Sequence, residues 1–308
     1  MSLLEMLGRR CRLSLKYAIS NVRRRIESGS LIDSWGAEYT ERMTQSIRWL
    51  QREIADRMLQ KLDIVKLEVR DILLIPDFPG EHGALFRKRF PGAALHGVFA
   101  EDLSGLAALR FRLGQKFRRV FRGESSIDLE SFLRTGRLEL PDNSVDLVFS
   151  DLLLQDLPQP QLFLKECWRV LCEGGLLTFS YLGPETGKEL FALEASQPLS
   201  LKRLASPWDM HDIGDALLGE RFSDPVMDME FITLDYESAT LMLSDAGALG
   251  LLEAVPSAND ERQLPKKLTL ELVYGHAWAI GKHLAKAQNQ VAYIDPNQIK
   301  RKTSSDSA

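Results

Sequence analysis

A chain of 308 residues that is 44% hydrophobic and 27% charged can bury the core of one large α/β domain, which argues against a wholly disordered protein. Its net charge of −4 argues against nonspecific nucleic-acid binding by the whole molecule. No apolar run reaches the roughly 18 to 20 residues of a membrane span, and no signal-peptide pattern is present, so we expect a cytoplasmic protein without a transmembrane segment.

Two helical patterns come first along the chain. Over 1–30, apolar residues recur every three or four positions from Leu4 to Ile26, which predicts an amphipathic helix. This segment is basic, and its meaning stays open between a partner helix, a membrane-surface helix and an organellar targeting peptide. Glu5 and the regular apolar stripe favour a permanently packed helix. A second series, from Met43 to Leu62, predicts a helical cap over 31–68.

From residue 69 the pattern changes to short apolar runs that alternate with helical stretches. Strands are predicted over 71–76, 94–99, 145–150 and 176–181, with helices near 81–90, 102–116 and 159–171. After Pro184 we predict a helix around 209–218, a strand over 229–236, a helix around 238–248 and a strand over 268–275. The order predicts a doubly wound, mostly parallel sheet over 69–285 that is closed by an antiparallel pair. The polar tail over 286–308 predicts disorder.

The chain has three cysteines, Cys11, Cys167 and Cys172, without paired C-x-x-C spacing. An odd number without that spacing predicts neither a disulfide framework nor a zinc site, so we expect no bound metal.

Five sequence blocks carry a family resemblance. NSVDLVFSDLLLQ (143–155) and LKECWRVLCEGGLLTFSYLGPETGKEL (164–190) are typical of the fourth and fifth strands of class I S-adenosylmethionine-dependent methyltransferases. Three narrower blocks, WLQREIADRMLQKLDIVKLE (49–68), DMHDIGDALLGERFSDPVMDMEFITLDY (209–236) and LTLELVYGHAW (268–278), resemble the malonyl-acyl-carrier-protein O-methyltransferases of biotin synthesis. The resemblance implies a Rossmann-like fold with a seven-stranded sheet, here with an N-terminal helical extension.

Such enzymes move the methyl group of S-adenosylmethionine onto the free carboxylate of a malonyl group on acyl carrier protein. The carboxylate is already a nucleophile at neutral pH, so alignment and exclusion of water would supply most of the catalysis. Substrate-side candidates are Tyr181, at the end of a strand, and His211, in a polar cluster; each has a structural alternative as a core aromatic or a hydrogen-bonded histidine.

The cofactor loop departs from the family pattern D-x-G-x-G-x-G. In LLIPDFPGEHG (73–83), Leu74 stands in place of the acid, and Pro76 and Phe78 stand in place of two glycines. Gly80 remains in register, and Asp77 and Gly83 are partial substitutes.

The second predicted strand departs too, because Phe99 replaces the acid that would hold the ribose. The nearest acids are Glu101 and Asp102, and Asp128 lies upstream of the place of an adenine-contacting acid. Asp151 follows the strand over 145–150 and is a further candidate for the cofactor pocket.

Two hypotheses come from the resemblance and its departures. One is an active O-methyltransferase with an unusual cofactor loop. The other is a non-catalytic relative that keeps the fold and the acyl-carrier surface but no longer binds S-adenosylmethionine. Binding of S-adenosylmethionine separates them, and the altered loop predicts that this binding is weak.

A basic run over 110–122 contains no acid and is predicted to lie beside the cofactor face. Acyl carrier proteins are acidic, so the run is a candidate docking surface, with a solvated helix as the alternative. Its members are Arg110, Arg112, Lys116, Arg118, Arg119 and Arg122.

Overall fold

The computed structural model describes residues 48–77, 81–99, 125–191, 201, 208–252 and 264–282. Three predicted segments lie outside the described residues: the basic helix over 1–30, the helix near 102–116 and the tail over 286–308. No helix within the described ranges is long and apolar enough to cross a membrane.

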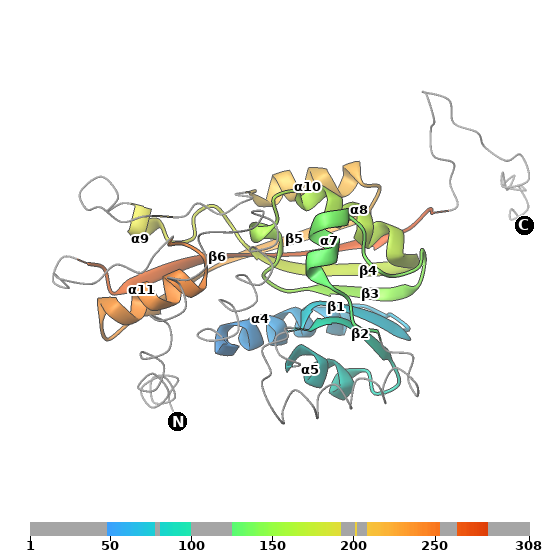
Figure 1. Ribbon diagram of the computed structural model, residues 1–308, viewed down its shortest axis with the longest axis horizontal. Coiled ribbons are helices and arrows are strands. Elements are labelled where there is room, and N and C mark those ends of the chain that lie inside the picture. Colours follow the sequence, from blue (N-terminus) through green and yellow to red (C-terminus); the bar gives the residue numbers. More distant parts are fainter. Residues whose placement is uncertain are drawn as a thin grey trace, which may run out of the picture.

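The described strands form one sheet in the order β2-β1-β3-β4-β6-β5 (Figure 1). They are β1 (Asp71–Asp77), β2 (Ala94–Phe99), β3 (Val145–Ser150), β4 (Leu171–Leu182), β5 (Ser223–Asp235) and β6 (Lys267–Ala279). The first four strands run parallel, β6 is antiparallel to β4, and β5 is antiparallel to β6. The mostly parallel sheet with an antiparallel closing pair is therefore confirmed.

The described part of the sheet has six strands, one fewer than the predicted seven. Beyond β2, Ser126 makes a single parallel bridge to Gly97, with the backbone N–H of Ile127 donating to the carbonyl of Gly97 at 2.8 Å. This bridge lies where a seventh parallel strand would join the sheet. The local sequence Ser-Ser-Ile-Asp has one apolar residue, too few to bury a strand on both faces.

Helices cover both faces of the sheet (Figure 1). On one face lie α4 (Arg48–Lys61) and α5 (Glu81–Arg89), and on the other lie α7 (Leu129–Thr135), α8 (Pro160–Val170) and α10 (Met210–Gly219). The remaining described helices are α9 (Lys188–Phe191), α11 (Ala239–Ala248), η3 (Leu62–Ile64) and η4 (Leu154–Asp156). The four helices predicted after residue 69 that fall within the described ranges are present, and α7 and α9 were not predicted.

Local chemistry sets the helix starts. Pro160 opens α8, where its missing N–H costs no hydrogen bond. Asp209 caps α10 by accepting from the backbone N–H groups of His211 and Asp212, and the Asp212 side chain accepts in return from the backbone N–H of Asp209. Ser238 caps α11 by accepting from the N–H of Leu241.

The core lies between the sheet and its two helical layers. β1 and β3 have continuous apolar runs because both of their faces are covered. On the face of α5, Phe86 packs edge-on against Phe149 with ring centroids 4.7 Å apart, and on the other face Phe132 of α7 meets Phe163 of α8.

The paired glycines after α8 lie within β4 rather than before it. Pairing with β3 jumps from Val145–Leu171 to Leu147–Leu176, so residues 172–175 bulge out of the ladder. Gly174 has φ +76°, which favours glycine, and a Cβ on Gly175 would lie 3.0 Å from the Cys172 carbonyl oxygen. The strand predicted over 176–181 therefore starts at Leu171 and bulges before residue 176.

Candidate functional site

The carboxyl ends of the four parallel strands meet at one edge of the sheet, here called the carboxyl edge. In open α/β sheets, ligands bind at this edge. β1 ends there at Asp77 and α5 begins nearby at Glu81, so the first turn of α5 lies at the carboxyl edge.

Pairing between β1 and β2 shifts just before this edge. Leu74 pairs with Gly97, but Asp77 pairs with Phe99, so β1 has one more residue than β2 over this stretch. Pro76, which has no backbone N–H, lies inside this bulge. Residues in a bulge are left out of the hydrogen-bonded ladder, so the missing donor breaks no strand pairing. The shift places Asp77 beside Phe99, the last residue of β2. Glu101 follows Phe99 by two positions in the sequence.

A buried group of three polar side chains, the edge cluster, ties the carboxyl edge together. His82 in the first turn of α5 has its Nε2 atom 3.0 Å from Oδ2 of Asp151, which follows β3. Because a carboxylate only accepts, this nitrogen carries the proton. Ser180 of β4 donates its Oγ–H to the other oxygen, Oδ1 of Asp151, at 2.6 Å. All three residues are at most 1% exposed.

The turn after β3 is held by the same serine. The backbone N–H of Leu152, a residue with φ +49°, donates to both the carbonyl oxygen and the Oγ of Ser180 at 3.1 Å. The buried Gln155 side chain donates to the Leu152 carbonyl at 2.8 Å and accepts from the N–H of Leu182 at 3.3 Å. The ends of β3 and β4 are therefore joined by both backbone and side-chain bonds.

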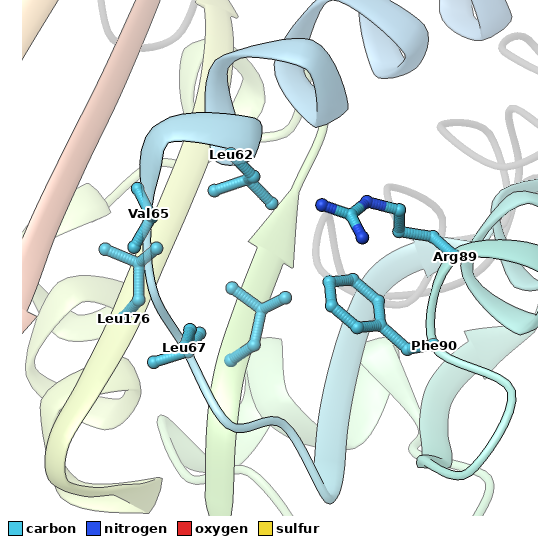
Figure 2. Close-up of a pocket in the computed structure, with 7 residues that line it drawn as sticks. Leu62, Val65, Leu67, Arg89, Phe90 and Leu176 are labelled. Atoms are coloured by element: carbon cyan, nitrogen blue, oxygen red, sulfur yellow. The ribbon is translucent and has the colours of Figure 1, made fainter.

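A small pocket lies toward the amino ends of β3 and β4. Figure 2 shows Leu62, Val65 and Leu67 on one side of it and Arg89 and Phe90 on the other. Its volume is about 80 Å³. Ligand sites for molecules of cofactor size have about 300–1,000 Å³, so this pocket does not compete with the carboxyl edge as a cofactor site.

Comparisons with known proteins agree with the fold. Residues 115–179 match the family model described as a methyltransferase domain. The chain is 35% identical over 255 residues to the malonyl-[acyl-carrier protein] O-methyltransferase of Gallionella capsiferriformans, a match that covers 74% of this chain and 83% of that protein. The protein of that name from Laribacter hongkongensis is 34% identical, with 74% and 82% covered. The chain belongs to the malonyl-[acyl-carrier protein] O-methyltransferase family.

Solved structures similar to this family member include the YcgJ protein of Bacillus subtilis. The TM-score is 0.49 at 13% identity, and the match covers 72% of this chain and 97% of that protein.

The three narrow sequence blocks of the malonyl-[acyl-carrier protein] O-methyltransferase family come together in space. Two side chains of α4, from the first block, contact the β5–β6 pair, from the second and third. Arg57 of α4 bonds Glu230 of β5 at 2.7 Å, and Lys61 pairs with Asp228 of β5 and lies 5.0 Å from the ring centroid of Tyr274.

Glu230 is the centre of this contact, because it also accepts from the hydroxyl of Tyr274 at 2.7 Å. Burial raises the pKa of Glu230, but the hydrogen bonds from Tyr274 and Arg57 outweigh burial and hold its pKa below the usual value. Burial and the bond to Glu230 raise the pKa of Tyr274, which keeps the phenol protonated as a donor.

The segment after β4 is fastened to β6 by a buried acid. Glu271, 6% exposed, accepts from the backbone N–H of Glu185 at 2.6 Å, and its own carbonyl accepts from the N–H of Gly183 at 2.9 Å. A Cβ on Gly183 would lie 2.5 Å from Cδ of Glu271, so a larger residue here would displace the Glu271 carboxylate. The family blocks therefore build the frame of the antiparallel half of the sheet.

The predicted cofactor residues are described only in part. Asp151 lies at the carboxyl edge, where it is buried and hydrogen-bonded through both carboxylate oxygens, and Gly83 is buried in the first turn of α5. The backbone of Asp77 ends β1, while Gly80, Glu101 and Asp102 lie outside the described residues. All six basic residues of the 110–122 run also lie outside them.

The two substrate-side candidates have different surroundings. Tyr181 is 1% exposed, and its hydroxyl donates to the backbone carbonyl of Asp209 at 3.0 Å, which ties β4 to the start of α10. Burial raises the pKa of Tyr181 above its usual range. The His211 side chain is 81% exposed and lies on the capping turn of α10, 3.7 Å from the Asp209 carboxylate.

Sequence reasoning missed His82. His82 comes directly after the altered glycine loop. The available signal was a histidine in the first turn of a helix that packs on the sheet. Its partner Asp151 is 69 residues away, so the pairing itself could not be read from local pattern.

Proposed function

We propose that this protein transfers a methyl group from S-adenosylmethionine to the free carboxylate of a malonyl group carried on acyl carrier protein. The observation that carries the proposal is membership of the malonyl-[acyl-carrier protein] O-methyltransferase family, with 83% of a 35%-identical relative covered. The fold supports it, because the parallel strands and the start of α5 form the edge at which such sheets bind ligands.

The reaction places few chemical demands on the protein. A malonyl carboxylate is ionised at neutral pH and attacks the methyl carbon itself, so no side chain has to remove a proton. The protein has to align the carboxylate oxygen with the methyl group and exclude water. A rigid edge whose turns are fixed by buried hydrogen bonds suits that task.

The Leu74 side chain cannot hydrogen-bond the methyl donor, because it is buried in the core at 1% exposure and carries no polar atom. The β1–β2 register shift instead brings Asp77 level with the end of β2. We assign binding of S-adenosylmethionine to Asp77, the last residue of β1, to Gly80 and Gly83 after it, and to Glu101 and Asp102 after β2. When bound, the sulfonium supplies the methyl group.

Asp151 and Tyr181 support the site indirectly. The Asp151 carboxylate already accepts from His82 and Ser180, and the Tyr181 hydroxyl is bonded to Asp209. His211 is accessible on the capping turn of α10, and we propose it as the substrate-side residue that contacts the malonyl group. The basic run over 110–122 is proposed to dock the acidic carrier protein.

The direct test is methyl transfer from radiolabelled S-adenosylmethionine to malonyl-acyl carrier protein, with acetyl-acyl carrier protein as the control because it lacks a free carboxylate. We expect label on the malonyl form alone, as an ester that mild base releases as methanol.

The core position of Leu74 favours a second candidate, a non-catalytic relative that binds acyl carrier protein but not the methyl donor. That candidate predicts no label on either carrier form together with measurable binding of malonyl-acyl carrier protein. Such a result would replace the enzyme proposal.

A further inference from the structure

The edge cluster joins three elements that must keep a fixed relation for a ligand to bind between them. His82 belongs to α5, Asp151 follows β3 and Ser180 belongs to β4. The His82–Asp151 contact is 3.0 Å long and the Ser180–Asp151 contact is 2.6 Å long, and all three side chains are buried. The cluster therefore fixes the first turn of α5 against the carboxyl edge.

Simple packing does not explain the choice of these residues. Burying a carboxylate and an imidazole costs desolvation, and apolar side chains of similar size often stabilise a core as well or better. Hydrogen bonds add direction, because they hold only within a narrow range of distance and angle. Apolar contacts to Phe149, whose ring centroid is 5.7 Å from that of His82, would tolerate sliding of the turn.

Between Asp71 and Asp77, β1 has no polar side chain that could anchor the turn. Leu74 is apolar and buried, and the β1–β2 register shift comes directly after it. No acid on β1 is therefore available at that level to anchor the start of α5. His82 reaches the carboxyl edge from α5 instead and bonds Asp151, the acid that follows β3.

We infer that His82 and Asp151 are a positioning pair, which sets the first turn of α5 at the distance from β3 and β4 that binding of the methyl donor requires. This inference rests on the proposed function. Neither residue is assigned contact with the donor or with the malonyl group. Their effect is to fix the backbone of the α5 turn, including Gly83.

A second histidine offers a matched control. His96 of β2 has its Nε2 atom 3.1 Å from Oδ1 of Asp71 and its Nδ1 atom 2.8 Å from Oγ of Ser125. This is also a histidine with an aspartate and a serine, and His96 is 8% exposed. It lies toward the amino end of β1, away from the carboxyl edge, so its loss removes similar bonds without touching the α5 turn.

The experiment uses the full chain and four proteins: wild type, His82→Ala, His82→Gln and His96→Ala. Titration calorimetry measures the Kd of S-adenosylmethionine, thermal unfolding measures stability, and hydrogen exchange follows the peptide that contains residues 81–86. We expect His82→Ala to weaken binding about 10- to 100-fold, the range typical of losing a residue that orients a binding group. His96→Ala should bind within about threefold of wild type.

The variant His82→Gln distinguishes loss of the hydrogen bond to Asp151 from loss of side-chain volume. The side-chain amide introduced by His82→Gln can still donate to Asp151, so this variant should recover most of the affinity that His82→Ala loses. Exchange in the 81–86 peptide should accelerate in His82→Ala and not in His96→Ala, with or without the methyl donor.

Different failures have different meanings. If wild type transfers methyl groups and both alanine variants bind the donor as it does, the positioning role is wrong and the proposed function stands. If His82→Ala and His96→Ala weaken binding equally, the loss reflects stability alone and again overturns the inference. A folded wild-type chain that binds no donor at millimolar concentration overturns both.

Discussion

Lys282, just beyond β6, is a cation held against backbone carbonyl groups. Its Nζ donates to Oδ1 of Asn143 at 2.8 Å and to the carbonyls of Arg169 and Leu171 at the end of α8, and it lies 4.4 Å from the ring centroid of Trp168. Cations suit a helix C-terminus. Burial nevertheless disfavours the charged form and lowers the pKa of Lys282 to about 8, from an ordinary value of 10.5.

This shift predicts a pH dependence of stability. Between about pH 8 and pH 10.5 the unfolded chain keeps the Lys282 proton while the folded chain has lost it, so the free energy of unfolding rises with pH in that window. Below pH 8 both states are protonated and the contribution is constant.

Lys282→Met removes the titrating group and with it this contribution to the pH dependence of the free energy of unfolding. Urea unfolding of both proteins across the window should show wild type gaining stability relative to the variant as pH rises, with other titrating groups cancelling in the difference. Parallel curves would mean that the lysine keeps its ordinary pKa when folded.

At the scale of elements, a glycine and an aromatic ring lie very close together in the antiparallel β4–β6 pair. Adding one methyl group at that glycine should therefore lower the stability of the protein. Gly275 is directly opposite Phe179, and a Cβ on Gly275 would lie 2.1 Å from the ring atom Cζ. Gly275→Ala therefore forces a buried ring off its position, and overpacking of this kind costs about 1–3 kcal/mol.

Gly214 supplies the opposite case. It lies inside α10, and a Cβ there meets nothing within 4 Å. Gly214→Ala should stabilise the protein by about 0.5–1 kcal/mol, because alanine loses less backbone entropy in a helix. Denaturant unfolding of both variants should give shifts of opposite sign. A neutral Gly275→Ala would show that the β4–β6 spacing adapts.

Much of this arrangement of elements could be predicted from sequence. Strand bounds at 94–99 and 145–150 agree with the structure because each is a short, mainly apolar run that closely follows turn residues, Pro91-Gly92 and Asp142-Asn143. β4, β5 and β6 each extend beyond their predicted bounds, because pairing with a neighbour carries polar residues into the ladder. The short α7 has only seven residues, fewer than helical periodicity needs to stand out.

The candidate site was less accessible to prediction. The position of Asp151 at the carboxyl edge follows from strand order alone. Its partners do not, because His82 and Ser180 are 69 and 29 residues away in the chain. The same holds for the bonds between α4 and β5, which join residues 173 and 167 positions apart.

For the whole molecule, the distribution of charge predicts how the protein meets its partner. The net charge is −4, yet the 110–122 run contains six basic residues and no acid. Reversing two of these charges in Arg118→Glu with Arg119→Glu should weaken binding of acyl carrier protein, and added salt should weaken binding to the unmodified protein, since screening acts on exposed charges.

The control is Arg23→Glu with Arg24→Glu, which changes net charge equally in a segment outside the family likeness. Surface plasmon resonance at low and physiological salt measures both. Equal affinity of the two double variants would assign the 110–122 run to ordinary solvated surface.

The two sides of the contact between α4 and the β5–β6 pair leave the ribosome at different times. Arg57 leaves the ribosome 173 residues before its partner Glu230. At about 5–20 residues per second, the Arg57 side chain waits roughly 9 to 35 s for this partner. β6 lies between β4 and β5 in the sheet, so until it is made β4 has an open edge and β5 has no partner strand. Truncation before β6 should therefore yield aggregates rather than a smaller folded domain.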